Sequence, residues 1–165
     1  MMGFFDKLFS SKQQDFILKS PVKGQAVPLS EVSDPTFGEG ILGQGVAIKP
    51  SADRVCAPCD AVVEMMFDTA HAVSLKAENG AEVLIHVGLE TVSLKGEHFK
   101  ALVKSGDHVT AGQPLIEYER KALEEKGFDT IIPVVICNTD SFEHVTAVTG
   151  EVNEGDEILK IGQKK

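Results

Sequence analysis

Short runs of apolar residues, separated by glycine, proline and other turn-forming residues, make up most of the chain from Ser20 onward. Many short strands punctuated in this way are typical of an antiparallel β-sandwich or barrel. One stretch, Lys121–Gly127, has the pattern of a short helix, with Gly127 as its expected stop. The expected strands are Val22–Val27, Ile41–Ile48, Val55–Phe67, Ala72–Ala77, Val83–Leu89, His98–Val103, Pro114–Tyr118, Ile132–Cys137, Val145–Val148 and Ile158–Ile161.

Two of these runs flank Asn79-Gly80, a strong hairpin signal because both residues tolerate a positive φ. With this pair at the centre of the loop, Glu78 faces Ala81, and the numbers of paired residues sum to 159. His71 and His86 then lie on the same face of the hairpin, diagonal to each other and roughly 7–8 Å apart at Cα. A shift of the pairing by one residue would move them to opposite faces.

Two histidines on one face of a sheet are open to three interpretations. They can be structural residues with satisfied hydrogen bonds, or two ligands of a metal site, which needs a third and usually a fourth ligand. They can also be a nucleophile and a group that stabilises what is transferred.

The apolar residues around the pair favour the nucleophilic interpretation. In the predicted register, Val73, Leu75 and Leu84 share the histidine face. The opposite face carries Val83, Ile85, Val87 and Leu89. One apolar face must be core, so the other is a candidate docking surface around the histidines.

The segment Gly80–Val92 closely resembles the phosphohistidine signature of the glucose-type enzyme IIA of the bacterial phosphoenolpyruvate-dependent sugar phosphotransferase system. Asp68–Ala72 resembles the segment of that family that carries a supporting histidine. Three further stretches occur in family order, Gly45–Pro50, Leu94–Glu97 and Thr130–Val135. The resemblance covers about Ser20 to Ile161. It implies an all-β, antiparallel sandwich and barrel hybrid, built on a duplicated hybrid motif, with at most short helices.

The resemblance also implies the function and the role of each site residue. A phosphocarrier of this family accepts a phosphoryl group from HPr and passes it to an enzyme IIB domain for sugar uptake. His86 is the expected nucleophile, through Nε2, with its Nδ1–H held by the Gly88 carbonyl. His71 is expected to donate a hydrogen bond to the phosphoryl oxygens, and Thr69 to orient His71. No cofactor or metal is required, although His71 and His86 could bind zinc if a partner supplied a carboxylate.

Docking of the two partners is expected to use an apolar patch with a polar rim. The apolar candidates are Phe37, Ile41, Phe67, Leu84 and Val92. Asp34 and Glu90 are candidate rim acids for a basic HPr surface. Relatives often carry Asp where Glu90 stands, so the longer side chain departs from the family's pattern at that contact.

Length and charge agree with a carrier that meets protein partners. A chain of 165 residues is enough for one domain with its own core. The net charge of −9, no Trp and one Tyr argue against nucleic acid as a partner and favour a basic protein. The start of the chain lacks a signal-peptide pattern, and no apolar run approaches the roughly 20 residues of a membrane span. We therefore expect a cytoplasmic protein.

Residues 1–16 form an expected N-terminal tail, and residues 17–165 the enzyme IIA domain. Phe4, Phe5, Leu8 and Phe9 fall on one face if the tail is helical. Such an amphipathic segment can lie in a membrane interface, so peripheral membrane contact through the tail is a further expectation.

Three other features of the sequence are compared with known kinds of chemistry. Cys56 and Cys59 have the spacing of a redox motif, but a strand-like run follows them, not the helix N-terminus that lowers a thiol pKa, so we interpret them as structural. A lipoyl or biotinyl carrier needs a lysine at a hairpin tip, and Glu64–Phe67 has none. A lysostaphin-like zinc hydrolase needs a His-x-His pair, which His86-Val87-Gly88 lacks. The remaining histidines are expected at the surface, His98, His108 and His144.

Overall fold

The computed structural model describes residues 14–164, so the predicted amphipathic segment Phe4–Phe9 lies outside the described residues. The strands are β1 Phe16–Lys19, β2 Gly24–Pro28, β3 Gln44–Pro50, β4 Arg54–Cys56, β5 Ala61–Met66, β6 Ala72–Ala77, β7 Glu82–His86, β8 Phe99–Ala101, β9 His108–Val109, β10 Pro114–Tyr118, β11 Ile132–Ile136, β12 Phe142–Ala147, β13 Gly150–Val152 and β14 Glu157–Gln163. The helices are α2 Pro35–Gly38 and α3 Arg120–Glu125, and short 3-10 turns are η2 Leu29–Glu31, η3 Thr91–Leu94 and η4 Thr139–Ser141.

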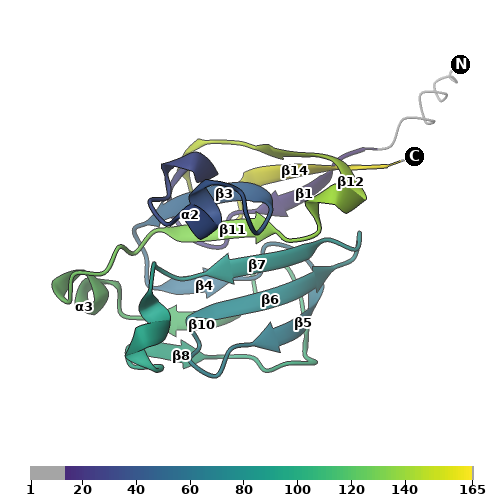
Figure 1. Cartoon of the computed structure of the whole chain (residues 1–165). Coiled ribbons are helices and arrows are strands. Elements are labelled where there is room, and N and C mark those ends of the chain that lie inside the picture. Colours follow the sequence, from purple (N-terminus) through teal and green to yellow (C-terminus); the bar gives the residue numbers. More distant parts are fainter. Residues whose placement is uncertain (1–13, 165) are drawn as a thin grey trace, which may run out of the picture.

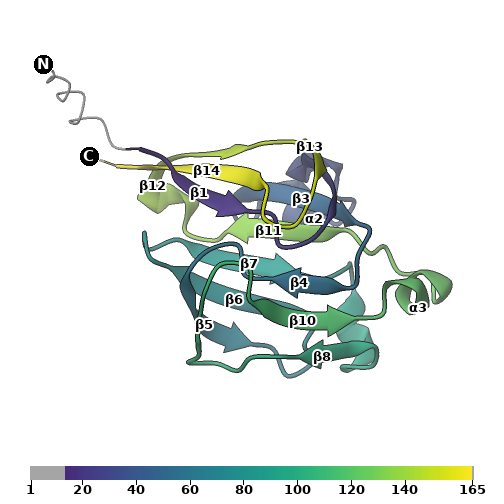
Figure 2. The same cartoon turned by 180° about the vertical axis from the view of Figure 1, so that it is seen from behind.

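The strands form one large sheet and two small ones. The large sheet has the order β13-β2-β3-β11-β7-β6-β5-β9, and the small sheets are β1-β14-β12 and β4-β10-β8. Strands β7, β6 and β5 lie in front of β4, β10 and β8 in Figure 1, and the view from behind in Figure 2 reverses this order. Every strand pair that is hydrogen-bonded is antiparallel. The predicted antiparallel all-β sandwich with short helices is confirmed.

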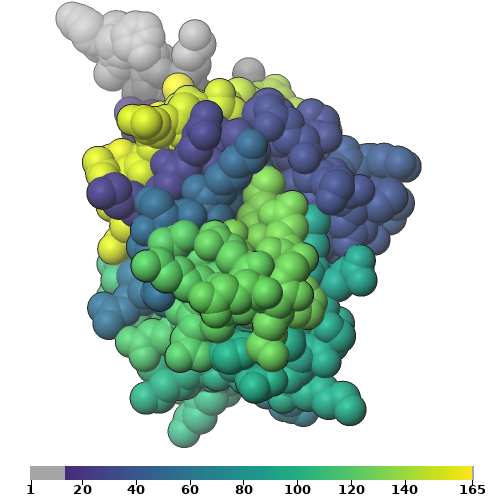
Figure 3. All heavy atoms as spheres, turned by 90° about the vertical axis from the view of Figure 1, so that its left-hand side faces the viewer, coloured from purple at the N-terminus to yellow at the C-terminus, as the bar shows by residue number. Residues whose placement is uncertain are grey.

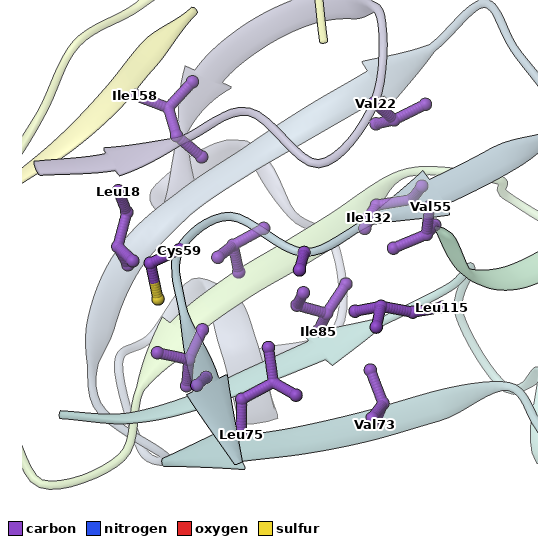
Figure 4. Close-up of a cluster of buried hydrophobic side chains, with 14 of the residues drawn as sticks. Leu18, Val22, Val55, Cys59, Val73, Leu75, Ile85, Leu115, Ile132 and Ile158 are labelled. Carbon is purple, nitrogen blue, oxygen red and sulfur yellow. The ribbon is translucent and has the colours of Figure 1, made fainter. Parts of the chain in front are cut away.

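The main hydrophobic core fills the space between the layers (Figure 4). Val73, Leu75 and Ile85 of the large sheet face Val55 and Leu115 of the small sheet behind it, and all five are fully buried. Burying one such side chain stabilises the fold by roughly 1.5–3 kcal/mol relative to leaving it exposed. The alternate residues of β6 and β7 point to the other face of the sheet, where Leu84 packs against a second, smaller cluster that includes Phe37 and Val135.

The hairpin of β6 and β7 has a three-residue loop, so the predicted register is wrong by one residue. Its pairs run from Lys76–Glu82 to Ala72–His86, and their numbers sum to 158. A two-residue type I′ turn needs a positive φ at both central residues, but only Gly80 has one, at 90°. Ala77 N–H instead donates to the Ala81 carbonyl across the loop.

The shifted register also corrects the predicted faces. Leu84 shares the face of His86, as predicted, but Val73 and Leu75 belong to the core face with Val83 and Ile85. Ala72 and Ser74 take their places beside His86. The histidine face of this hairpin is therefore more polar than the sequence pattern indicates.

The predicted strand Val55–Phe67 is two strands in different sheets. β4 pairs with β10 in a small sheet, whereas β5 pairs with β6 in the large one. The chain crosses between the layers at Ala57–Asp60, where Pro58 lacks the N–H that a central strand would need.

The predicted short helix is confirmed: α3 ends before Gly127, whose φ is +88°. In Figure 3 the green residues of the segment around α3 lie across the middle of one face of the molecule.

Two Gly-Asp turns repeat the same construction in distant parts of the chain. Asp107 caps the Lys104 N–H and Asp156 caps the Asn153 N–H through their side chains, at 2.9 and 2.7 Å. The adjacent glycines have φ of +94° and +95°. Each turn also exchanges a pair of backbone hydrogen bonds with one distant residue, Val63 in the first case and Ser20 in the second. This repetition supports the predicted duplicated motif.

Cys56 and Cys59 are both free and buried. Burial, with a smaller contribution from Glu154, raises the pKa of Cys56 to about 11, and burial raises the pKa of Cys59 to about 12. Cys56 ends a strand and does not precede a helix. These observations support the structural interpretation.

We expect iodoacetamide at mildly alkaline pH to label the exposed Cys137 of the folded protein and to spare Cys56 and Cys59. The reason is that iodoacetamide alkylates only those thiolates that it can reach. Peptide mass spectrometry measures this, with the denatured protein as the control in which all three react. Labelling of Cys56 or Cys59 before Cys137 would contradict the structural interpretation.

Candidate functional site

His71 and His86 lie side by side on the outer face of the large sheet. Their ring centroids are 4.8 Å apart and the ring planes are at 84°. His86 is the last residue of β7, and His71 stands just before β6, after Ala70, whose φ is +55°. Because His71 is outside the regular strand, the alternation of side chains does not fix its direction. The two rings therefore meet although the register is shifted by one residue.

One nitrogen of His86 faces a backbone carbonyl. Its Nδ1 is 2.7 Å from the Gly88 carbonyl oxygen. A carbonyl only accepts hydrogen bonds, so Nδ1 carries the proton and Nε2 of the neutral ring keeps its lone pair. Gly88 has a φ of +79°, and a Cβ built there would lie 2.7 Å from Thr91 Cγ2. Both its conformation and the space around it thus require glycine.

His71 is held by Thr69 on the side of its Nδ1. The Thr69 hydroxyl oxygen is 2.5 Å from that nitrogen. His71 is 3% exposed, which makes it one of three buried polar residues in the described part of the chain. The edge of Phe67 packs against its ring at 5.5 Å between centroids. The ring of Phe37 lies tilted against the ring of His86, with 5.0 Å between centroids.

Both histidines are neutral at neutral pH. Burial, reinforced by the proximity of His86, lowers the pKa of His71 from its ordinary 6.5 to about 4. Burial also lowers the pKa of His86, although the hydrogen bond to Gly88 and the carboxylate of Asp34 act in the opposite direction. A neutral imidazole is the form that has a free lone pair for attack.

The two rings form part of the floor of an open, largely apolar depression of about 400 Å³. Its lining includes all but one of the predicted docking residues: Asp34, Phe37, Phe67, Leu84, Glu90 and Val92. Ile41 does not line the depression. It is 68% exposed and precedes Leu42, which does line it. Asp34 has a structural task as well, because its carboxylate accepts a hydrogen bond from the Thr36 N–H at the start of α2.

Three residues of this surface were not predicted. Thr36 and Leu42 line the depression, and the sequence Asp34-Pro35 at the start of a helix is the signal that could have placed Thr36 there. Met65 is 51% exposed and pairs with Ser74, which pairs with Leu84. Directly opposite residues share a face, so Met65 extends the apolar surface beside the depression.

A larger hollow of about 620 Å³ lies elsewhere, over β8 and β10. Two pairs of its charged groups are in contact with each other: Arg54 with Glu117 at 3.1 Å, and His98 with Glu119 at 2.6 Å. His98 is thus largely covered, with 17% of its side chain exposed, whereas His108 is exposed as predicted. Within residues 14–164, no group of three His, Cys, Asp or Glu is arranged to hold a metal ion.

The pair consists of two neutral histidines beneath an apolar depression, and one of them has its proton fixed on Nδ1. This is the arrangement that group transfer through a histidine requires. A family model described as "phosphoenolpyruvate-dependent sugar phosphotransferase system, EIIA 1" matches residues 16–142. The chain belongs to this family.

The similarity to individual proteins extends over nearly the whole chain. The "PTS system glucose-specific EIIA component" of Oceanobacillus iheyensis is 41% identical over 95% of this chain and 98% of its own length. The "PTS system glucoside-specific EIICBA component" of Staphylococcus carnosus is 43% identical over 88% of this chain, which corresponds to 21% of that longer protein. The solved structure of glucose permease IIA from Mycoplasma capricolum superposes with a TM-score of 0.80 at 31% identity and covers 90% of this chain and 96% of that one.

Membership of this family excludes the two alternative functions, a lipoyl or biotinyl carrier and a lysostaphin-like zinc hydrolase. A swinging-arm carrier would present a lysine at a hairpin tip, but Glu64–Met66 lie within β5 and hold none. A zinc hydrolase would need a ligand cluster, which the described residues lack. None of the helices within residues 14–164 has the length and the apolar character that a membrane span requires.

The lowered pKa of His71 predicts a specific dependence of stability on pH. The unfolded chain binds a proton at His71 below pH 6.5, whereas the folded protein does so only near pH 4. The free energy of unfolding should therefore fall as the pH is lowered from 6.5 to 4, by on the order of 3 kcal/mol from this residue. Urea titrations of the wild type and His71→Gln across this range measure the difference. Equal slopes in the two proteins would show that His71 titrates normally.

Proposed function

We propose that this protein is a phosphocarrier that accepts a phosphoryl group from phospho-HPr on Nε2 of His86 and passes it to an enzyme IIB domain. The observation that carries the proposal is the contact of His86 Nδ1 with the Gly88 carbonyl, because it leaves Nε2 as the free nucleophile. The family membership supports the partners, and the fused EIICBA relative is named for three components in one chain. A cytoplasmic location follows from this role.

The transfer step needs no proton acceptor in this chain. As the lone pair of Nε2 forms a bond to phosphorus, the bond from phosphorus to the donor's leaving atom breaks and the electron pair leaves with that atom. The proton on Nδ1 stays hydrogen-bonded to Gly88 O, so the phosphorylated ring carries a positive charge that the carbonyl stabilises. A cationic ring is a good leaving group, which keeps the phosphoryl group transferable to the next partner.

His71 serves as a donor to the phosphoryl oxygens in this proposal. Its ring is neutral at pH 7, so it has one N–H to give. If that proton is on Nε2, Nδ1 must accept, and the Thr69 hydroxyl is placed to donate to it. Positioning and charge stabilisation of this kind are the main requirements of phosphoryl transfer.

Docking is assigned to the depression and its rim. Val92 is 53% exposed at the edge of the depression, and Phe67 lies beside His71. Glu90 is exposed in a left-handed conformation at the same rim, and the protein as a whole carries a net charge of −9. A basic partner would be steered to such a surface at low ionic strength.

The two histidines should respond differently to glutamine. His86→Gln removes the nucleophile and should abolish uptake of the phosphoryl group. His71→Gln keeps one N–H donor and should still take up phosphate, but should pass it on more slowly, by on the order of 10²–10³. Incubation with phospho-HPr, mass spectrometry of the labelled peptide and addition of a IIB domain measure both steps.

His108→Gln is the matched control, because His108 is an exposed histidine outside the depression. It should match the wild type in both steps. Phosphate found on His71, or uptake by His86→Gln, would reverse the assignment of the two roles.

A charge placed in the apolar rim should weaken docking without altering the histidines. Val92→Asp should reduce the affinity for HPr by roughly tenfold or more, because docking would bury the added carboxylate against apolar surface without a partner. Leu102→Asp is the control, since Leu102 is also an exposed apolar residue but does not line the depression. Calorimetric titration with HPr distinguishes the two variants, and equal losses of affinity would remove Val92 from the interface.

A further inference from the structure

The Gly88 carbonyl can hold His86 only if the peptide groups on both sides of Gly88 are themselves fixed. The peptide group after Gly88 is anchored by the Leu89 N–H, which donates to the Asp129 carbonyl at 2.9 Å. In a trans peptide the C=O points away from the N–H, so this bond aims the Gly88 carbonyl toward His86. The peptide group before Gly88 is anchored by its own N–H, which donates to the Ile131 carbonyl at 3.0 Å.

The Val87 N–H also donates to the His71 carbonyl, at 2.7 Å, and a further anchor of this turn is the side chain of Thr91. Its hydroxyl donates to the Val87 carbonyl at 2.6 Å, the carbonyl of the residue between His86 and Gly88. Thr91 is completely buried, as is Val87, so water cannot replace this bond. The Thr91 methyl group packs beneath Gly88, where it would be 2.7 Å from an added Cβ. Of the contacts that fix the turn, this is the one made by a side chain and thus open to substitution.

We propose that Thr91 is a positioning residue that fixes the proton of His86 on Nδ1, by holding the Val87–Gly88 turn in the conformation that aims the Gly88 carbonyl at the ring. Thr91 does not touch the reacting atoms. It acts through the backbone: without its hydroxyl the buried Val87 carbonyl has lost its partner, and the peptide can rotate to find another. The Gly88 carbonyl then moves away from Nδ1, and the other tautomer of His86, which has no lone pair on Nε2, becomes populated.

Two substitutions distinguish the role of the Thr91 hydroxyl from that of its methyl group. Thr91→Val keeps the shape and the methyl group but removes the hydroxyl, whereas Thr91→Ser keeps the hydroxyl and removes the methyl group. Thr139→Val is the matched control. The Thr139 hydroxyl also donates at 2.6 Å to a buried backbone carbonyl, that of Ile136, but does not contact the turn beside His86.

The test is the imidazole ¹⁵N spectrum of His86, together with its titration and the rate of phosphate uptake from phospho-HPr. The wild type, Thr91→Ser and Thr139→Val should show one tautomer with the proton on Nδ1. Thr91→Val should show a mixture, with a lower His86 pKa because the hydrogen bond to Gly88 that raises it is weakened. Its uptake rate should fall by about tenfold or more, as is typical when a partner that orients a histidine is lost.

A pure Nδ1–H tautomer in folded Thr91→Val, or a mixture in Thr139→Val, would overturn the inference. If Thr91→Val does not fold, Thr91→Ser decides: a mixture of tautomers there would show that the methyl group, not the hydroxyl, positions the turn. Only the rate rests on the proposed function. The spectrum needs no phosphoryl donor, so a wild type that fails to take up phosphate would refute the proposed function and leave the role of Thr91 intact.

Discussion

A carbonyl oxygen accepts hydrogen bonds and cannot donate them, and the chemistry of this protein depends on where one such oxygen points. The Gly88 carbonyl faces Nδ1 of His86 and thereby leaves Nε2 unprotonated. Its direction is set by backbone hydrogen bonds from Leu89 and Gly88 to residues 129 and 131, just before β11. The pairing of β7 with β11 in the middle of the large sheet therefore controls the protonation of the proposed nucleophile. Rigid strands place such a group more accurately than a mobile loop would.

Burial keeps the two site histidines neutral, although the negative net charge of the protein favours their protonated form. A net charge of −9 favours the protonated form of histidine, and so does the carboxylate of Asp34 near His86. The pKa values of both site histidines are nevertheless lowered, because their surroundings are apolar: Phe37 against His86 and Phe67 against His71. The two phenylalanines thus help to keep both histidines neutral, in addition to lining the proposed docking surface.

The sequence predicts the all-β class, the hairpin and the meeting of the two histidines, because each depends on local patterns or on the family signature. The predicted register is wrong, because it assumes a positive φ at Asn79 as well as at Gly80, and asparagine adopts either sign of φ. The error did not separate the histidines because His71 lies outside β6. Two features have no signal in the local sequence, because packing between distant segments determines them. They are the division of Val55–Phe67 between two sheets and the position of Leu42 beside the site.

The depression above the histidines is open, and a group bonded to Nε2 of His86 would stand in contact with solvent until another protein covers it. The partner's surface thus completes the dry environment in which transfer occurs, and each of the two partners would have to do so over the same residues. Donor and acceptor would then exclude one another, and the carrier could work only by dissociating between them. Affinity beyond what is needed to expel water would slow the cycle. A small patch with a charged rim therefore suits a protein that must be released as readily as it is bound.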